Sequence, residues 1–415
     1  MSKKQIHIIG GGIIGLCSAY YLNKEGVEVT IVDKSDLTDG TSHGNSGMIV
    51  PSHFVPLASP GVIAQGIKWM FNSKSPFYIK PRLSLELAQW IWKFYRSCNR
   101  QNVNRAIPVL FEFNQLSKQL YKEFAELPDF SFCFEEKGLL MLYKSAHQEK
   151  DEREMAERAN DLGIEAKIVP PNELRSIEPS IQLDVRGGLY FPGDAHLYPN
   201  KFVRQLITYL QRKGVHFLTG KSVDDFDLSK GKIKSVRFEN GDHLDVKNVL
   251  FSGGSWTGRL FQKLGIKLPL QDGKGYSITL NEPKLKPEIP TILTEAKVAI
   301  TPMGKDLRIG GTLEISNFSK SINTKRLEGI IESIPKYYPE LAIDMPRKEN
   351  VWYGYRPCTP DGMPYIDQSQ LIKNAFVATG HGMMGMSLGP ATGKMVSELF
   401  LAKKTSIPLD LMRIR

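Results

Sequence analysis

The sequence has few of the features that mark secreted, metal-binding or membrane-spanning proteins. Its four cysteines (Cys17, Cys98, Cys133 and Cys358) lie far apart and form no CxxC pair. This spacing excludes a cysteine-rich zinc or iron–sulfur site and gives no disulfide framework, so we expect a reducing compartment and no metal. No uninterrupted apolar run reaches 18 residues, so no segment is expected to cross a bilayer. The chain also has no internal repeat and no low-complexity stretch.

Basic residues are in excess but are not clustered. The formal net charge is +10, from 54 Lys and Arg against 44 Asp and Glu. Such an excess favours an anionic substrate, a phosphate-bearing cofactor or an anionic membrane surface. Nucleic acid is not expected as a partner, because no run of five or six basic residues occurs.

The N-terminus superficially resembles a signal peptide, since Lys3 and Lys4 precede an apolar run over residues 6–22. Glycines interrupt that run at the positions of a different motif, so a cytoplasmic protein is expected. The motif is G-x-G-x-x-G over residues 10–15, between a predicted strand at 5–9 and a predicted helix from Ile14 to about Lys24. A second strand, Val27–Val32, follows, and this βαβ context is typical of dinucleotide binding.

Each residue type in this motif has a physical reason. Gly10 permits a tight turn, Gly12 lets the backbone approach a pyrophosphate, and Gly15 lets helix and strand pack closely. The helix N-terminus offers free N–H groups to the phosphates. Asp33 is placed to accept hydrogen bonds from a ribose 2′-OH and repels a 2′-phosphate, which argues against NADP. These residues alone leave FAD and NAD as alternatives.

Three further segments favour FAD. Residues 39–51, DGTSHGNSGMIVP, are small and polar, and residues 248–258 form an apolar strand that ends in small residues and Trp256. A strand at 216–219 precedes Val223. At the far end of the chain, residues 378–386, ATGHGMMGM, open an apolar helix predicted over 389–401. Such a turn directs backbone amides at an electron-rich group, as at the flavin ring, whereas an NAD enzyme has no use for this second helix start.

The order of GGGIIG, GNSGMIVP, PGVIAQGIKWMF, KGYS, GYRPCTPDG and TGHGMMG resembles the D-amino acid oxidase superfamily, and within it the bacterial D-amino acid dehydrogenases, over nearly the whole chain. The resemblance implies an α/β (α+β) fold. A glutathione-reductase-like FAD-binding Rossmann domain would interleave with a substrate domain built on an antiparallel sheet. We assign residues 1–60, 192–270 and 350–415 to the FAD domain, and 61–191 and 271–349 to the substrate domain.

The resemblance and the motifs together define a predicted cofactor site for noncovalent FAD. Its predicted residues are Gly10, Gly12, Ile13, Ile14, Gly15, Asp33, Lys34, Ser42, Asn45, Ser46, Gly47, Met48, Val223, Ser252, Gly253, Trp256, Gly382, Met383, Met384 and Gly385. Some amine oxidases of the superfamily attach FAD through a cysteine, but that cysteine lies farther upstream than Cys358 does here.

Three residues are the candidates for substrate chemistry. The motif around Arg356 resembles the family's G-x-R-P-x-T-P-D-G, whose arginine binds the substrate carboxylate, a role that suits a planar guanidinium. Tyr276 is predicted to complete this clamp, with a structural role as the alternative. His53 follows the flavin-contacting segment and is a candidate to face the substrate, although a structural role is the simpler interpretation. His381 is interpreted as a packing residue within the cofactor-binding turn.

The implied reaction is hydride transfer from a small D-amino acid to the flavin, followed by hydrolysis of the imine. A dehydrogenase for D-hydroxyproline or another cyclic imino acid, or a glycine- or sarcosine-type enzyme, remains an alternative, and an FAD-dependent tRNA-modifying enzyme is a distant one. The electron acceptor is expected to be a quinone or another carrier. Aromatic and basic residues alternate over residues 66–96, which suits either peripheral contact with the inner face of the plasma membrane or a helical core segment.

Overall fold

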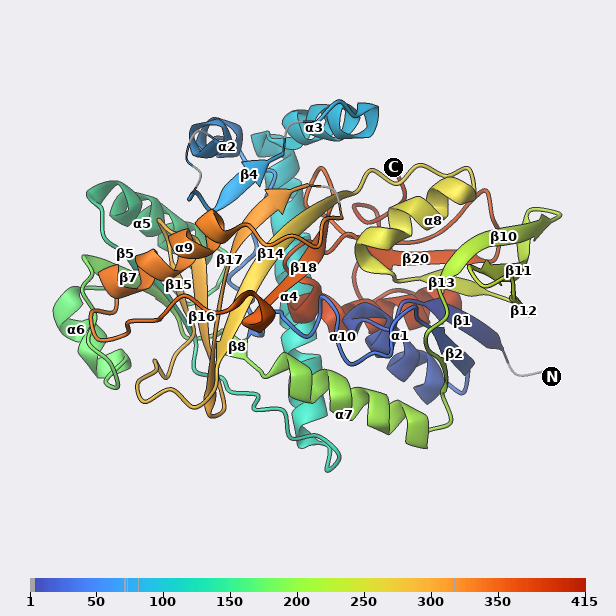
Figure 1. Cartoon of the computed structure of the whole chain (residues 1–415), viewed down its shortest axis with the longest axis horizontal. Coiled ribbons are helices and arrows are strands. Elements are labelled where there is room, and N and C mark those ends of the chain that lie inside the picture. The colour runs from blue at the N-terminus through green and yellow to red at the C-terminus, as the bar shows by residue number, and fades with distance from the viewer. Residues whose placement is uncertain (1–3, 71, 73, 81, 317) are drawn as a thin grey trace.

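The computed structural model describes the whole chain except residues 1–3, 71, 73, 81 and 317. Lys3 and Phe71, which belong to the apolar and aromatic segments discussed above, therefore lie outside the described residues. Two large sheets dominate the architecture, and helices cover them (Figure 1). The mixed α/β fold predicted from the motifs is observed.

The first sheet has six strands in the order β19-β20-β13-β1-β2-β9, all parallel except β19. Its strands are β1 (Gln5–Ile9), β2 (Glu28–Val32), β9 (His216–Leu218), β13 (Val249–Phe251), β19 (Tyr365–Gln368) and β20 (Ala375–Thr379). Helices α1 (Ile13–Lys24) and α10 (Gly385–Phe400) pack against each other beside this sheet. The chain's two ends thus meet in one layer, as the pair of glycine-rich helix starts predicts.

The second sheet is mostly antiparallel, in the order β18-β14-β17-β16-β15-β5-β7-β6, with β4 paired to β17. Its strands are β4 (Phe77–Ile79), β5 (Leu139–Tyr143), β6 (Lys167–Val169), β7 (Gly187–Phe191), β14 (Gln271–Leu280), β15 (Thr291–Leu293), β16 (Val298–Met303), β17 (Asp306–Ile315) and β18 (Val351–Cys358). Smaller pairings join β3 (Met48–Ile49) to β8 (Ala195–His196), and β10 (Val223–Ser229), β11 (Lys232–Phe238) and β12 (His243–Asp245) to one another.

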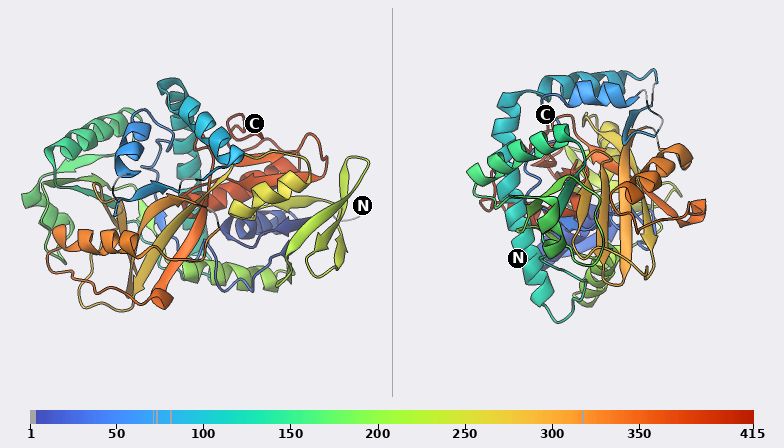
Figure 2. Two further views of the ribbon diagram at one scale, coloured as in Figure 1. Left: turned by 45° about the horizontal axis from the view of Figure 1, so that its top comes forward. Right: turned by 90° about the vertical axis from the view of Figure 1, so that its left-hand side faces the viewer.

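The remaining helices cover the sheets and join them. They are α2 (Val62–Met70), α3 (Leu85–Ser97), α4 (Arg100–Glu126), α5 (Ala146–Asp161), α6 (Pro171–Ile177), α7 (Pro199–Arg212), α8 (Thr257–Lys263) and α9 (Thr324–Ser333). The long helix α4 runs across the molecule, transverse to its longest axis, and packs on α10, where Tyr121 donates to the Met386 carbonyl at 2.6 Å (Figures 1 and 2). In the described part of the chain, no helix is long and apolar enough to span a membrane.

The sheet topology shifts one of the predicted boundaries. Strand β18 begins at Val351, inside a segment that we assigned to the FAD domain, yet it pairs with β14 along its whole length. The boundary placed at residue 350 is therefore too early, because the GYRPC segment completes the second sheet before the chain returns to the first. The other sheet strands lie in the segments that we assigned to them.

Candidate active site

One large cavity, of about 1240 Å³, is lined by residues from both sheets. Every predicted cofactor and substrate residue borders it except Gly15 and Gly47. A pocket that holds a drug-sized ligand has about 300–1,000 Å³, so this cavity has room for a dinucleotide and a small second molecule. The sequence segments that we singled out therefore converge on one site.

Gly10 and Gly15 explain why the first turn must be glycine-rich. Gly10 has a φ of +111°, and a Cβ there would lie 2.6 Å from the Ser252 carbonyl oxygen. A Cβ on Gly15 would lie 2.0 Å from the Gly10 carbonyl oxygen. Both distances are shorter than a carbon–oxygen contact allows. Glycine is therefore required at position 10, where the turn approaches the segment after β13, and at position 15, where α1 approaches the end of β1. Gly15 thus serves the packing role predicted for it, away from the cavity.

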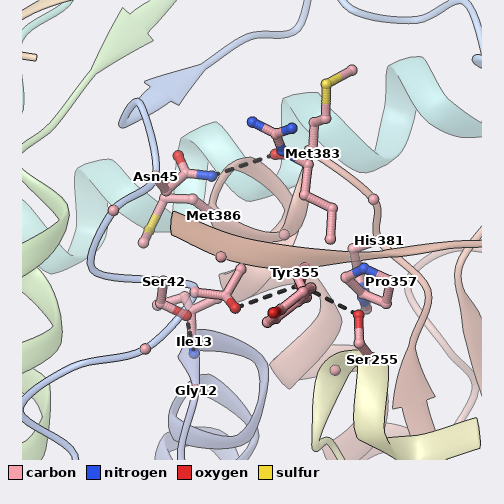
Figure 3. Close-up of a pocket in the computed structure, with 18 of the residues that line it drawn as sticks. Gly12, Ile13, Ser42, Asn45, Ser255, Tyr355, Pro357, His381, Met383 and Met386 are labelled. Carbon is pink, nitrogen blue, oxygen red and sulfur yellow. Dashed lines mark hydrogen bonds between the residues drawn. The ribbon is translucent and has the colours of Figure 1, made fainter. Parts of the chain in front are cut away.

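The N-terminus of α1 opens towards the cavity. Its first residues have no side-chain cap in the described structure, apart from the Ile13 N–H, which donates to Ser42 Oγ at 3.0 Å (Figure 3). The Gly11 N–H donates to Asp33 Oδ2 at 2.7 Å, which fixes that carboxylate beside the glycine turn. Free N–H groups at a helix start bind phosphate. This end of the cavity fits the pyrophosphate and ribose of a dinucleotide.

A second helix start faces the same cavity from the other end of the chain. Helix α10 begins at Gly385, four residues earlier than predicted, and the described residues provide no side-chain cap for it. Asn45 Nδ2 donates to the Met383 carbonyl at 3.4 Å, which ties the two predicted flavin segments together (Figure 3). Two helix starts that border one cavity offer the free backbone N–H groups that the phosphates and the electron-rich ring edge of FAD would need.

Aromatic and polar groups complete the wall. Lys34 Nζ lies 3.3 Å from the centroid of the Trp256 ring, which also stacks on Phe318. His43, which the sequence interpretation did not select, borders the cavity, and both of its ring nitrogens lack a hydrogen-bond partner among the described residues. Both nitrogens are closed off from the cavity, so they give no evidence of a ligand. The residues of this site fit FAD.

Two residues of the second sheet hold the loop that is predicted to contact the flavin, and sequence reasoning missed both. Arg308, on β17, donates to the carbonyls of His43 and Asn45 at 2.6 and 2.8 Å. Ser277, on β14, donates to the Gly44 carbonyl at 3.0 Å. A buried arginine in a strand was the available signal, but its partners are backbone carbonyls more than 260 residues away in sequence.

Arg356 lies on β18 and its side chain crosses the face of the sheet. It passes over Gly275 on β14, where a Cβ would lie 2.3 Å from either terminal nitrogen, and its Nη1 donates to the Thr312 carbonyl on β17. Burial lowers its pKa. No carboxylate lies within ion-pair distance of it among the described residues. A cavity-facing guanidinium with no anionic partner is a site for a carboxylate ligand.

Tyr276 is not brought to Arg356. The two paired strands place Arg356 opposite Gly273 and Tyr276 opposite Tyr353, so their side chains leave opposite faces of the sheet. The Tyr276 hydroxyl accepts the Asn323 N–H at 3.2 Å, and burial raises its pKa to about 12. Although Tyr276 borders the cavity, the predicted clamp of Arg356 and Tyr276 is not formed.

His53 borders the cavity beside the second sheet. Burial, and secondarily the charge of Lys297, lower its pKa to about 4, so its ring is neutral at pH 7. Its Nδ1 lies 3.2 Å from Ser52 Oγ, which in turn donates to the buried carboxyl of Asp194 at 2.5 Å. Sequence reasoning selected His53 but not Ser52, Lys297 or Asp194.

Two other candidates have structural contacts. The ring of His381 is buried and its Nε2 lies 2.9 Å from Thr392 Oγ1, while burial lowers its pKa to about 3. Cys358 is buried, is not among the residues that border the cavity, and its pKa is raised to about 12 by burial.

The comparisons with known proteins agree with this site. A family model described as DAO, FAD dependent oxidoreductase, matches residues 5–399. The chain belongs to the DAO family of FAD-dependent oxidoreductases. A D-amino acid dehydrogenase of Helicobacter pylori strain J99 is 31% identical over 399 residues, which are 96% of this chain and 95% of that protein. A D-amino acid dehydrogenase of Methylobacterium nodulans is 29% identical over 411 residues, 97% of this chain and 96% of that protein.

Solved structures confirm the fold of this DAO family member. Glycine oxidase from Geobacillus kaustophilus aligns with a TM-score of 0.77 at 20% identity, and the alignment covers 100% of this chain and 99% of the other. L-proline dehydrogenase from P. horikoshii aligns with a TM-score of 0.76 at 21% identity, over 99% of this chain and 96% of the other. The protein is therefore a member of the DAO family of FAD-dependent oxidoreductases with a two-sheet architecture shared with these structures.

Proposed function

We propose that the protein oxidises the Cα–N bond of a small D-amino acid, with noncovalently bound FAD as the hydride acceptor. The observation that carries the substrate assignment is Arg356, a cavity-facing guanidinium without an anionic partner among the described residues. The two D-amino acid dehydrogenases named above, which resemble the chain over nearly its full length, support the choice of the D-series.

Arg356 fixes the substrate by its carboxylate. A guanidinium makes two parallel charge-assisted hydrogen bonds to a carboxylate, which set both the position and the rotation of the amino acid. The bond from Nη1 to the Thr312 carbonyl holds the guanidinium from behind, so the remaining donors are free for the ligand. FAD, when bound, supplies the hydride acceptor. The protein's contribution is orientation and the exclusion of water.

Noncovalent attachment is supported by Cys358. Its thiol lies 3.4 Å from the Arg356 carbonyl oxygen and is not among the residues that border the cavity. The cysteine nearest in sequence to the substrate arginine is therefore turned away from the space that FAD fits.

The electron acceptor proposed is a membrane quinone, reached by peripheral contact with an anionic membrane. The support is an apolar surface on and around α2 and α3, which we call the α2–α3 patch. It comprises Ile67, Leu83, Leu85, Ile91, Trp92 and Tyr95, all exposed. The exposed basic residues Lys93 and Arg96 lie among them. Apolar groups beside cations suit the headgroup region of an anionic bilayer.

One experiment tests the substrate class. The yellow protein is mixed anaerobically with D-alanine, D-proline, cis-4-hydroxy-D-proline, glycine and L-alanine, and loss of flavin absorbance is followed. We expect bleaching by a D-amino acid, and no bleaching by its L-enantiomer. Bleaching by none of these compounds would contradict the proposal, and bleaching only by the cyclic acids would assign the enzyme to imino acids instead.

Arg356→Met tests the carboxylate site. Removing two charge-assisted hydrogen bonds should raise the apparent substrate constant roughly a hundredfold while FAD stays bound. The apparent substrate constant of Arg356→Lys should lie between those of Arg356→Met and the native protein, because lysine keeps the charge but cannot make the two parallel hydrogen bonds. Arg175→Met, at an exposed position on α6, is the matched control. An unchanged substrate constant in Arg356→Met would remove this residue from the assigned role.

A further inference from the structure

Beside Arg356, the cavity contains a second set of groups that the carboxylate contact does not use. Arg356 donates to Thr312, and the strand pairing places the preceding residue, Gly311, opposite Val298, next to Lys297. Lys297 borders the cavity and its charge acts on His53. The Thr312 carbonyl that holds Arg356 is therefore next to Lys297 in the sheet, and Arg356, Lys297 and His53 all border the same cavity.

None of the described residues of the second sheet that line the cavity carries a carboxylate. Arg356 is cationic and has no carboxylate partner among the described residues, and a like charge disfavours an ammonium group nearby. An amino acid bound here therefore presents its amine in the neutral form, whose proton has passed to water, and that form has N–H groups that need an acceptor.

The state of His53 is fixed by two residues behind it. Asp194 is buried, and its carboxylate oxygens accept the Ser52 N–H at 3.1 Å and the Ser52 hydroxyl at 2.5 Å. While Asp194 is ionised, above its raised pKa of about 7, the single hydroxyl proton of Ser52 lies on the bond to the carboxylate. The Ser52 oxygen can then only accept a hydrogen bond from His53 Nδ1. The proton of the neutral ring is then on Nδ1, and Nε2 is left with its lone pair.

The Nε2 atom is the group that remains available. It has no hydrogen-bond partner among the described residues. The ring nitrogens of His43 and His196 also lack partners among these residues, but they are fully buried, whereas His53 Nε2 is not. His53 itself is only partly buried and borders the cavity. Its unprotonated nitrogen is therefore accessible from the cavity.

We propose that His53 Nε2 accepts a hydrogen bond from the neutral amine of the substrate, and that Ser52 and Asp194 are positioning residues which hold the ring in the accepting tautomer. This inference rests on the proposed function, because it assumes an amino acid whose carboxylate occupies Arg356. With carboxylate and amine both held, the Cα–H bond has a single orientation, which is what hydride transfer needs.

The test distinguishes the binding of the substrate's amine from the binding of its carboxylate. Propionate has the carbon skeleton of D-alanine without the amine, so its binding, measured by the change in flavin absorbance of the holoenzyme, reports the Arg356 site alone. In His53→Phe we expect the propionate dissociation constant to stay within twofold of the native value. The apparent constant for D-alanine, or for the best substrate of the panel, should rise about tenfold, the cost of one lost hydrogen bond. His53→Gln, which restores an acceptor, should recover part of the loss.

The positioning residues have a test of their own. In Asp194→Asn, the new amide can donate to Ser52, which frees the serine proton for His53 Nδ1 and moves the ring proton to Nε2. We expect the same loss for the amino acid and the same unchanged propionate binding, which also shows that the variant is folded. His147→Phe, at an exposed site on α5, is the control.

The outcomes distinguish this inference from the function it rests on. If no amino acid bleaches the native flavin, both fail. If the native protein is bleached but His53→Phe has an unchanged constant for the amino acid, only the inference fails. An equal loss for propionate and the amino acid would also overturn it, because that pattern reports a distorted cavity and not a lost amine contact.

Discussion

At the scale of single residues, Asp194 has an unusual environment for a carboxyl group. It is buried, and desolvation raises its pKa to about 7, although the hydrogen bonds from Ser52 and the charge of Lys118 act in the opposite direction. A carboxyl group with a higher pKa in the folded than in the unfolded protein stabilises the fold when it is protonated. This stabilisation is fully present below pH 3.8, the pKa of the group in the unfolded chain. It is lost as the pH rises through the folded pKa of about 7.

Asp194→Asn should remove this pH dependence, because the amide is neutral throughout. We compare the free energy of unfolding of the native holoenzyme with that of the variant. The native value is expected to fall by about 4 kcal/mol relative to the variant between pH 4 and pH 7, because each pH unit contributes up to about 1.4 kcal/mol. Urea unfolding of both proteins at several pH values measures the difference. A constant difference across this range would mean that Asp194 is already ionised at pH 4.

At the scale of elements, the strand β14 shows how the sheet makes room for function. Its residues Gly273, Gly275 and Ser277 lie on the face of the sheet that carries the Arg356 side chain, and its Lys274 and Tyr276 lie on the other face. Gly275 is where the Arg356 side chain crosses the sheet. Glycine here is explained by the close approach of a side chain, and not by backbone conformation.

Gly275→Ala should therefore damage the site more than the fold. The added methyl group would meet the mobile end of Arg356, which can move away at little cost in stability. The displaced guanidinium should raise the apparent amino acid constant ten- to a hundredfold, while the thermal unfolding temperature of the holoenzyme changes little. Gly193→Ala, where no atom lies within 4 Å of the added carbon, is the control. A normal substrate constant in Gly275→Ala would contradict the position of Arg356 described above.

The same strand shows what sequence can and cannot predict. The βαβ start and the glycine turns are local, so the positions of α1 and the cofactor loops follow from spacing and residue type. The faces of β14 and β18 depend on register between segments about 80 residues apart. The sequence motifs predicted that Tyr276 and Arg356 lie in the same site. A shift of one residue in the strand register, however, changes the face of the sheet from which each side chain projects. Contacts such as Arg308 with the carbonyls of residues 43 and 45 are set by the assembled fold.

At the scale of the whole molecule, the cavity and the α2–α3 patch are neighbours. Helix α2 contributes Val62, Gln65 and Trp69 to the cavity wall and exposes Ile67 on the patch. Figures 1 and 2 place α2 and α3 on the same side of the molecule. The segment 66–96 contains both buried and exposed aromatic residues. On α3, Trp90 is buried and donates to the Cys358 carbonyl at 2.9 Å, while Trp92 is 60% exposed.

If this patch is the membrane contact, its apolar residues and its cations should both matter. The holoenzyme should sediment with vesicles that contain phosphatidylglycerol and not with pure phosphatidylcholine, and binding should weaken as salt rises. The triple variant Leu83→Ser, Leu85→Ser, Trp92→Ser should lose most of this binding while it still oxidises its amino acid with a soluble dye. Leu371→Ser, an equally exposed leucine on the turn between β19 and β20, should bind as the native protein does. Equal sedimentation of the triple variant and the native protein would place the membrane contact elsewhere. The shared helix α2 gives this result a consequence for electron transfer, because an acceptor dissolved in the bilayer would meet the cavity wall at the point where the protein touches the membrane.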